Sequence, residues 1–304
     1  MAETSVASVG EVRLIQRLRR LLPRTPPGVI GIGDDAAVLP WTKTASLLFA
    51  SDMFIEGVHF RKSATPAPWI GWKALASNVS DIAAMGGRPI AAVISLGLPP
   101  RTPLRFVDAV YRGVSRCARR YGVSIVGGDT VRAPQVVLDV AILGTVQKRH
   151  LVLRSGARVG DRVFATGRLG GSLRSGRHAR FQPRVAAAQW LVRHVPIHAM
   201  MDLSDGLVSD AWQLARASRV TIQLRESAIP VARAARTTWH ALMDGEDFEL
   251  LFAVPANACR KIPTTIGKIP VTEIGTVTAH GANVQLITRD GRSTRLLPHG
   301  FQHF

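Results

Sequence analysis

The acidic residues of this very basic chain are concentrated in a few short segments, most of which contain glycine. Thirteen of its 21 aspartates and glutamates lie in the segments 31–35, 51–59, 78–81, 127–130, 202–210 and 244–249. Carboxylate oxygens are the ligands that hard cations such as Mg²⁺ prefer, and such cations in turn hold phosphate groups. The distribution therefore predicts sites for hard cations and phosphate.

Two of these segments are expected on neighbouring strands. The sequence GIGDD at 31–35 follows a β-like run, where glycine lets the backbone turn sharply and expose the adjacent carboxylates. Such a turn alone is also compatible with a purely structural role. Ser51 and Asp52 end the next pair of strands, so we expect Asp52 to meet Asp35 across adjacent strands.

Asp81 lies inside an otherwise apolar predicted helix. A carboxylate on or near the buried face of that helix would cost several kcal/mol unless it were paired or bound to a metal. The alternative is that Asp81 faces water or caps a local amide. Given the other acidic segments, we interpret Asp81 as a metal ligand.

Three further glycine-rich turns suit anions or cations. GGDT at 127–130 offers backbone N–H groups for a phosphate and a carboxylate for a metal, and TGRLGGS at 166–172 is a strand-to-helix turn suited to an anion. DLSDG at 202–206 precedes a predicted helix, so Ser204 or Asp205 could simply be its N-cap, which leaves Asp202 unexplained. The chain contains neither a P-loop nor the protein-kinase signature, so a nucleotide enzyme would use a different phosphate cradle.

Length and composition describe a globular protein. The 304 residues suffice for two domains, and the hydrophobic content is 46%. We expect no membrane segment and no secretory signal, because no apolar run reaches the length needed. Cys117 and Cys259 are far apart, which argues against a disulfide scaffold and favours the cytoplasm. The net charge of +18 allows nucleic-acid binding, but the arginines are spread along the chain, so we favour a solvated surface that attracts nucleotides.

The periodicity predicts the elements that must position these acids. In the first half we expect helices over 12–22, 68–85 and 102–121 and strands over 29–32, 36–39, 47–50, 90–98, 123–126 and 136–146. After a break at 148–160 we expect helices over 184–194 and 205–218 and strands over 162–166, 220–224, 249–254, 272–277 and 283–288. Strands and helices that do not alternate strictly predict two α+β domains, 1–148 and 149–304.

The ordered motifs resemble the thiamine-monophosphate kinases, a family in the superfamily of aminoimidazole ribonucleotide synthetase and selenophosphate synthetase. The motifs are GIGDDAAVL, SDMFIEGVHF, WKALASNVSDIAAMGGRPIAAVISLGLP, GGDTVRAP, RSGARVGDRVFATGRLGGS, AMMDLSDGLVSD and GEDFELLF, and they span nearly the whole chain. The resemblance implies the two-domain α+β fold of that superfamily, with an N-terminal sheet domain that forms a homodimer and a C-terminal α+β domain.

The resemblance also assigns roles to individual positions. The implied magnesium ligands are Asp35, Ser51, Asp52, Asp81, Asp129, Asp202 and Asp205. The implied ATP contacts are Gly128, Asp129, Arg154 and Ser204, and the implied substrate contacts are His59, Glu246 and Phe301. Asp52, Asp81, Asp129 and Arg154 are expected to act in catalysis.

The implied reaction converts ATP and thiamine monophosphate to ADP and thiamine diphosphate. The nucleophile would be a phosphate oxygen, which is largely ionised at neutral pH because its second pKa is about 6, so no general base is needed. Several Mg²⁺ ions would offset the repulsion between two polyanions. The alternatives are another ATP-using enzyme of the superfamily, or a basic nucleic-acid-binding protein that lost activity; the intact set of acids argues against the latter.

Overall fold

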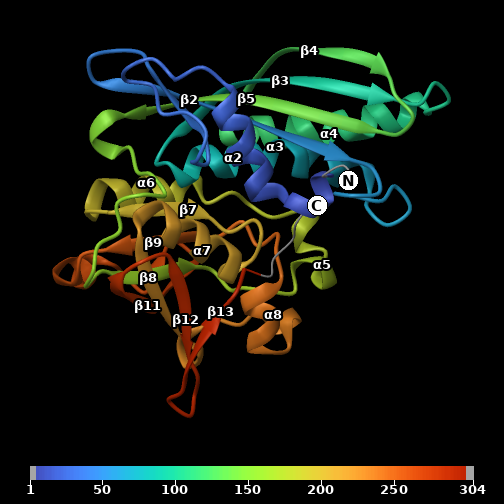
Figure 1. The fold of residues 1–304 in the computed structure, drawn as a ribbon. Helices are drawn as coiled ribbons and strands as arrows, with labels where there is room; N and C mark the ends of the chain where they lie inside the picture. Colours follow the sequence, from blue (N-terminus) through green and yellow to red (C-terminus); the bar gives the residue numbers. More distant parts are fainter. Residues whose placement is uncertain (1–4, 299–304) are drawn as a thin grey trace.

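Two mixed β-sheets, each with its own helices, form the molecule (Figure 1). The computed structural model describes residues 5–298. The first sheet has the order β1-β2-β5-β3-β4. Its strands are β1 (Ala37–Pro40), β2 (Ala45–Ile55), β3 (Arg88–Leu98), β4 (Ser124–Arg132) and β5 (Val137–Gln147). Only the β3–β4 pair is parallel, so the connection between these two strands needs the long helical crossover that separates them in the sequence.

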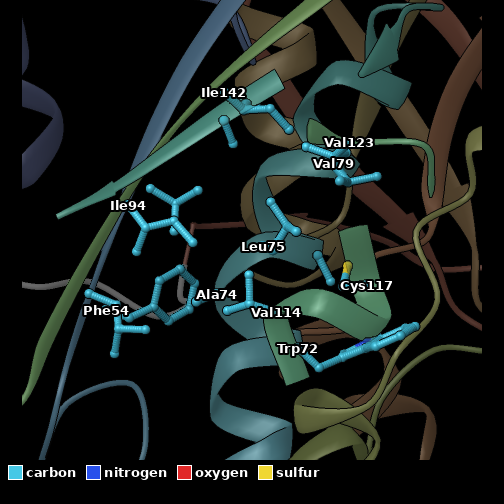
Figure 2. Packing of buried hydrophobic residues seen from close by; sticks show 14 of the residues in the cluster. Phe54, Trp72, Ala74, Leu75, Val79, Ile94, Val114, Cys117, Val123 and Ile142 are labelled. Carbon is cyan, nitrogen blue, oxygen red and sulfur yellow. The ribbon is translucent and has the colours of Figure 1, made fainter. Parts of the chain in front are cut away.

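Helices α3 (Ala67–Ala84) and α4 (Leu104–Tyr121) cover one face of the first sheet. Most of α3 is buried because it also contacts the second sheet, whereas α4 buries only one stripe. Figure 2 shows the core between these helices and the sheet, with Leu75 and Val79 of α3 and Ile94 of β3 among its residues. This packing fixes the position of α3, which carries Asp81 in its last turn.

Two glycines let α3 and α4 approach closely. A Cβ atom at Gly71 of α3 would lie 2.0 Å from the Val110 carbonyl oxygen, and one at Gly113 of α4 would lie 1.8 Å from the Pro68 carbonyl oxygen. Real side chains do not fit at such distances. The crossing of the two helices therefore depends on the absence of a side chain at both positions.

The other face of the first sheet has no helix over it among residues 5–298 (Figure 1). Apolar side chains stand on its strands: Phe49 and Met53 of β2 are 45% and 53% exposed, and Val131 of β4 is 54% exposed. All nine residues of β4 are exposed. A row of exposed apolar side chains on a sheet is a typical interaction surface.

The second sheet has the order β13-β12-β8-β11-β6-β9-β7, and β10 pairs with β11. Its strands are β6 (Arg162–Thr166), β7 (Ala199–Asp202), β8 (Val220–Arg225), β9 (Leu250–Val254), β10 (Thr265–Ile266), β11 (Ile269–His280), β12 (Asn283–Ile287) and β13 (Ser293–Leu296). Val163 and Ala165 of β6 share a core cluster with helix α7 (Leu207–Ser218), and Phe164 shares another with helix α6 (Val185–His194). Helices therefore cover both faces, as the alternation along a central strand requires.

The remaining elements are short. They are the α-helices α1 (Val6–Val9), α2 (Glu11–Leu21), α5 (Ser172–Ser175) and α8 (Thr238–Met243), and the 3₁₀-helices η1 (Lys148–His150), η2 (Arg177–Ala179), η3 (Glu226–Ala228), η4 (Arg233–Ala235) and η5 (Ala256–Lys261). Across the described part of the chain, every helix is too short or too polar to cross a membrane.

The structure confirms the α+β class and most of the predicted elements, with one clear error. The predicted strand over 29–32 is wrong: only a single bridge joins Ile30 to Val38. The chain turns there, because Gly28 and Gly33 both have positive φ. The predicted strand over 47–50 is longer than expected, since β2 continues through Ser51 and Asp52. The domain boundary after residue 148 stays a proposal; it falls within η1.

Candidate functional site

Three carboxylates from separate segments converge between the two sheets. Asp35 precedes β1, Asp81 lies in the last turn of α3, and Asp202 ends β7. One oxygen atom of each lies within 4.8 Å of one oxygen of the other two. We call these three residues the acid cluster. Its members lie in parts of the chain more than 40 residues apart, so the fold and not the local sequence brings them together.

The acid cluster is electrostatically strained. Burial, followed by the charge of Asp35, raises the pKa of Asp202 to about 8. Burial and the charges of Asp52 and Asp202 raise the pKa of Asp81 well above its ordinary value. Burial also raises the pKa of Asp52 to about 6, with Asp139 and Asp205 adding to the effect. Without a cation, these groups therefore hold protons that ordinary aspartates would release near pH 4.

Arg154 provides part of the compensation. Its Nε and Nη2 atoms donate to Asp35 Oδ1 at 3.0 and 2.6 Å, and its backbone N donates to both oxygens of Asp34 at 3.1 and 3.2 Å. Nη1 donates to Gln213 Oε1 on α7 at 2.6 Å. Although burial disfavours its charge, the carboxylate of Asp35 raises the pKa of Arg154 above its ordinary value. The Arg154 side chain thus connects the loop before β1 to helix α7.

Two carboxylate oxygens at this site are buried without a hydrogen-bond partner among the described residues: Asp35 Oδ2 and Asp210 Oδ1. Ser80 Oγ, in contrast, donates to Asp202 Oδ2 at 2.5 Å. A buried acceptor without a partner is costly in a native protein. Asp35 Oδ2 is therefore a ready ligand atom for a cation.

Sequence reasoning left Asp34 and Asp210 out of the site. Burial, then the charge of Asp35, raises the pKa of Asp34 to about 7, and burial raises that of Asp210 well above its ordinary value. Asp210 Oδ2 accepts from the backbone N of Asp205 at 3.1 Å. The signal was present, since both aspartates lie inside the acidic segments and Asp210 sits one turn into α7 beside Asp205.

The side chains of Ser51 and Asp52 point to opposite faces of β2, as neighbours on a strand do. Ser51 Oγ donates to Asp139 Oδ1 on β5 at 3.0 Å. The sheet register pairs Asp139 with Ser95 of β3 and Ser95 with Asp129 of β4. Asp129 therefore lies in the same row of the first sheet as Asp139, and it is not a member of the acid cluster.

Gly128, next to Asp129, is a position that only glycine can occupy. Its φ is 154°, and a Cβ atom there would lie 1.9 Å from the Ile94 carbonyl oxygen. A pocket of about 540 Å³ lies at the start of the same strand. Its lining includes Tyr111 and Arg119 of α4 and Ile125 of β4.

Ser204 and Asp205 do not cap α7. The N-cap is Gly206, and no side chain caps that helix end. Asp205 Oδ2 instead accepts from Gln213 Nε2 at 3.4 Å, and the Ser204 carbonyl oxygen accepts from the backbone N of Glu246 at 2.6 Å. The capping alternative for these two residues is therefore wrong, because the N-cap position belongs to Gly206.

Two of the three predicted substrate residues lie close together. His59 Nδ1 accepts from the backbone N of Ile55 at 3.0 Å. Lys73 Nζ donates to the His59 carbonyl oxygen at 3.0 Å and also forms an ion pair with Glu246. Lys73 connects them although it was not predicted to belong to the site. Phe301, the third, lies outside the described residues.

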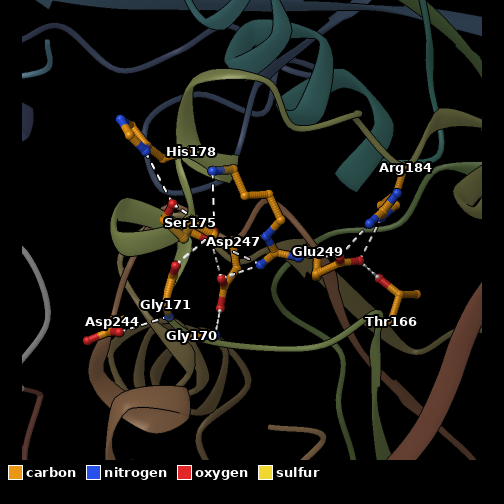
Figure 3. A network of polar contacts seen from close by, with 11 residues as sticks. Thr166, Gly170, Gly171, Ser175, His178, Arg184, Asp244, Asp247 and Glu249 are labelled. Atoms are coloured by element: carbon orange, nitrogen blue, oxygen red, sulfur yellow. Dashed lines mark hydrogen bonds and ion pairs between the residues drawn. The ribbon is translucent and has the colours of Figure 1, made fainter. Parts of the chain in front are cut away.

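The rest of the GEDFE segment is held by arginines (Figure 3). Arg184 Nε donates to Glu249 Oε2 at 2.6 Å, and Thr166 Oγ1 donates to the same oxygen at 2.7 Å. Arg177 forms ion pairs with both Asp247 and Glu249. We call the two acids with Arg177 and Arg184 the paired cluster. Both of its acids are paired with arginine, whereas in the acid cluster Arg154 pairs with Asp35 and one oxygen of Asp35 has no partner among the described residues.

Comparison with known proteins shows the family of this chain. Residues 33–146 match the N-terminal domain of AIR synthase related proteins, and residues 158–287 match the C-terminal domain. The thiamine-monophosphate kinase of Rhodopirellula baltica is 37% identical over 96% of this chain and 97% of that protein. This chain belongs to the thiamine-monophosphate kinase family. The relative from Synechococcus elongatus is 33% identical over all of this chain and 99% of its own length.

Solved structures of family members share the whole fold. The structure described as AaThiL complexed with AMPPCP and TMP superposes with a TM-score of 0.87 at 31% identity and covers 100% of both chains. A hydrogenase maturation protein, HypE, superposes with a TM-score of 0.72 at 21% identity, which shows the shared fold alone. The two-domain superfamily fold expected from the sequence is thus confirmed.

Proposed function

We propose that this protein transfers the γ-phosphoryl group of ATP to thiamine monophosphate and releases thiamine diphosphate. The observation that carries the proposal is the acid cluster, whose three carboxylates lie between the two sheets in a chain that matches one of these kinases over 96% of its length. Phosphoryl transfer needs positioned charge more than a strong base, and this site provides charge.

The residues of the acid cluster fit Mg²⁺. The cluster combines hard oxygen ligands, a buried oxygen of Asp35 without a partner, and carboxyl groups whose mutual repulsion raises their pKa values. We propose that Asp35, Asp81 and Asp202 hold the ion, with Ser51, Asp52, Asp129 and Asp205 contributing to further sites. When bound, Mg²⁺ would neutralise phosphate charge and stabilise the in-line transition state.

The protein's own groups would orient the two phosphates. We propose that Arg154 donates to a phosphate of ATP, because its guanidinium already lies at the acid cluster with donors aimed at carboxylate oxygens. The backbone N–H groups at Gly128 and Ser204 would bind other phosphate oxygens. The attacking oxygen belongs to thiamine monophosphate and is ionised at neutral pH, so no side chain needs to remove a proton from it.

We place the base of the nucleotide in the pocket at the start of β4. The pocket combines the Tyr111 ring with apolar walls, and it is three residues before Gly128 on the same strand. An aromatic ring beside an apolar wall suits a flat heterocycle. This position supports the assignment of Gly128 as an ATP contact.

A homodimer through the uncovered face of the first sheet is also proposed. The exposed Phe49, Met53 and Val131 on that face support it, because a second copy would remove them from water. Light scattering should give the mass of a dimer at micromolar concentration, and a monomer would contradict the proposal.

Location in the cytoplasm stays a prediction, which the free thiols of Cys117 and Cys259 support. The absence of a nucleic-acid partner also stays a prediction.

Product analysis tests the function. The purified protein is incubated with ATP, Mg²⁺ and either thiamine monophosphate, free thiamine or a phosphorylated aminoimidazole nucleotide. We expect thiamine diphosphate from the first acceptor alone. Equal or faster turnover of another acceptor would overturn the assignment, and binding of DNA in a filter assay at two salt concentrations would favour the nucleic-acid alternative.

A further inference from the structure

Lys73 is a buried lysine in the middle of α3. Its side chain is 2% exposed, and it is among the largest fully buried side chains of the protein. Lysine is almost never fully buried unless its charge is paired. The position therefore calls for a reason beyond filling the core.

The partners of Lys73 come from both halves of the chain. Nζ donates to the carbonyl oxygen of His59, in the loop after β2, and to the carboxylate of Glu246, in the segment between α8 and β9. These are the two described residues assigned to the acceptor. The Glu246 side chain remains 25% exposed, so its carboxylate is accessible while Lys73 holds it from the buried side.

The segment that carries Glu246 is held in a conformation it would not adopt alone. Glu246 and Phe248 have positive φ values of 63° and 50° although neither is glycine. Such conformations persist only where the surrounding structure fixes them. Residues in this region of backbone space often belong to ligand-binding segments, where the strain sets the position of a side chain.

The residue next to Lys73 holds the same segment from a second side. Trp72 Nε1 donates to the Phe181 carbonyl oxygen at 2.7 Å, and the Phe181 ring stacks on Phe248 with centroids 3.8 Å apart. Lys73 thus contacts one end of the segment from Glu246 to Phe248 directly, and the neighbouring Trp72 holds the other end through Phe181. The helix that carries Asp81 therefore also fixes the residue assigned to the acceptor.

We propose that Lys73 is a positioning residue for the acceptor: it sets the Glu246 carboxylate and the His59 loop in their binding geometry before thiamine monophosphate arrives. The inference rests on the proposed function. Lys73 acts through Glu246 and touches neither the reacting phosphates nor the acid cluster. Its removal should weaken acceptor binding selectively, because ATP is assigned to Gly128, Arg154 and Ser204.

The first test compares Lys73→Met with Lys62→Met. Methionine keeps the length of the buried side chain and removes its charge. We expect the KM for thiamine monophosphate to rise about tenfold in Lys73→Met, with the KM for ATP changed less than about twofold. Lys62 pairs with Glu56 at the surface at 3.0 Å, so its variant should leave both KM values unchanged.

A double-mutant cycle with Glu246→Gln shows whether Lys73 acts through Glu246. In the Glu246→Gln background, Lys73→Met should add less than about a twofold change in the acceptor KM, since the partner it positions has lost its charge. Equal effects of Lys73→Met in both backgrounds would overturn the proposed route. A lowered Tm with an unchanged acceptor KM would show that Lys73 is only structural.

A second substitution decides the matter if Lys73→Met does not fold. Lys73→Arg retains the charge but presents a planar head group of different reach, so it should raise the acceptor KM at least about threefold and leave the KM for ATP unchanged. An unchanged acceptor KM in this variant would overturn the proposal. Failure of the proposed function would be seen separately, as a wild-type protein that does not turn over thiamine monophosphate.

Discussion

The acid cluster and the paired cluster both remove carboxylates from water, but the protein treats them differently. Glu249 of the paired cluster receives Arg184, Arg177 and Thr166. The acid cluster has Arg154 and Ser80 for three carboxylates, and one oxygen of Asp35 has no partner among the described residues. A satisfied buried network stabilises a fold, whereas an unsatisfied one needs something from outside. The difference in partners therefore distinguishes the paired cluster, which has a structural role, from the acid cluster, which is a binding site, although both come from the acidic motifs.

Asp81→Asn should give the largest effect. The substitution keeps the shape of a cluster ligand and removes its charge, so kcat should fall by at least about 10²-fold, as after the loss of one preorganised electrostatic group. In the cation-free protein at neutral pH the Tm should stay equal or rise, because repulsion is relieved. Steady-state kinetics and thermal melts measure the two effects.

The control for this prediction is Asp108→Asn, at an exposed aspartate of α4. It should change neither kcat nor Tm. If Asp81→Asn instead unfolds the cation-free protein and leaves the turnover of the surviving fraction intact, Asp81 belongs with the scaffold and the comparison fails at that position.

Arg184→Met should show the opposite pattern. It removes one of two arginines from the buried Glu249, so the free energy of unfolding should fall by about 2 kcal/mol while kcat per folded molecule changes less than about threefold. Urea denaturation with kinetics on the same preparation measures both. The control is Arg180→Met, at an exposed arginine of the same segment, which should change neither the free energy of unfolding nor kcat. If Arg184→Met instead lowers kcat without lowering stability, the paired cluster belongs to the active site.

The pH dependence of stability should be set by the acid cluster. The pKa values of Asp202 and Asp52 are raised in the folded state to about 8 and about 6, above an ordinary value of 3.8. The folded state therefore binds more protons than the unfolded state between these values, and the stabilisation they give is lost as the pH rises from about 4 to about 8. The Tm of the cation-free protein should accordingly be lower at pH 8 than at pH 5.

Mg²⁺ with nucleotide should raise the Tm most at the upper end of this range, by an amount set by the ratio of ligand concentration to Kd. Asp202→Asn should flatten the Tm profile of the cation-free protein. A profile equally steep in that variant would mean that other groups carry the dependence.

The smallest effects should come from the two hydroxyl groups that donate to these acids. Thr166→Val removes a donor to Glu249 and an acceptor for the backbone N of Leu250, so stability should fall by about 1–2 kcal/mol. Ser80→Ala removes the donor to Asp202 and should cost less than about 1 kcal/mol but lower kcat about threefold. If Ser80→Ala proves the more destabilising of the two, the acid cluster is held by hydrogen bonds in the same manner as the paired cluster.

The sequence predicted the acidic motifs, the fold class and most elements, since apolar periodicity determines which segments are buried. The sequence did not show that Glu246 and Glu249 have different roles. Glu246 pairs with Lys73 and Glu249 pairs with two arginines, and these partners lie 65 residues or more away in the chain. The turn at 29–32 was mistaken for a strand because its β-branched residues outweighed the glycines around them.

The two glycines at the crossing of α3 and α4 have a consequence for how this protein tolerates change. Gly71 is ten residues before Asp81 on the same helix, which places the two positions about 15 Å apart along α3. A methyl group at Gly71 or Gly113 would push the two helices apart and so displace the Asp81 carboxylate. In a library of random variants selected for growth on thiamine monophosphate, positions 71 and 113 should therefore be as intolerant as the aspartates, although neither contacts a substrate.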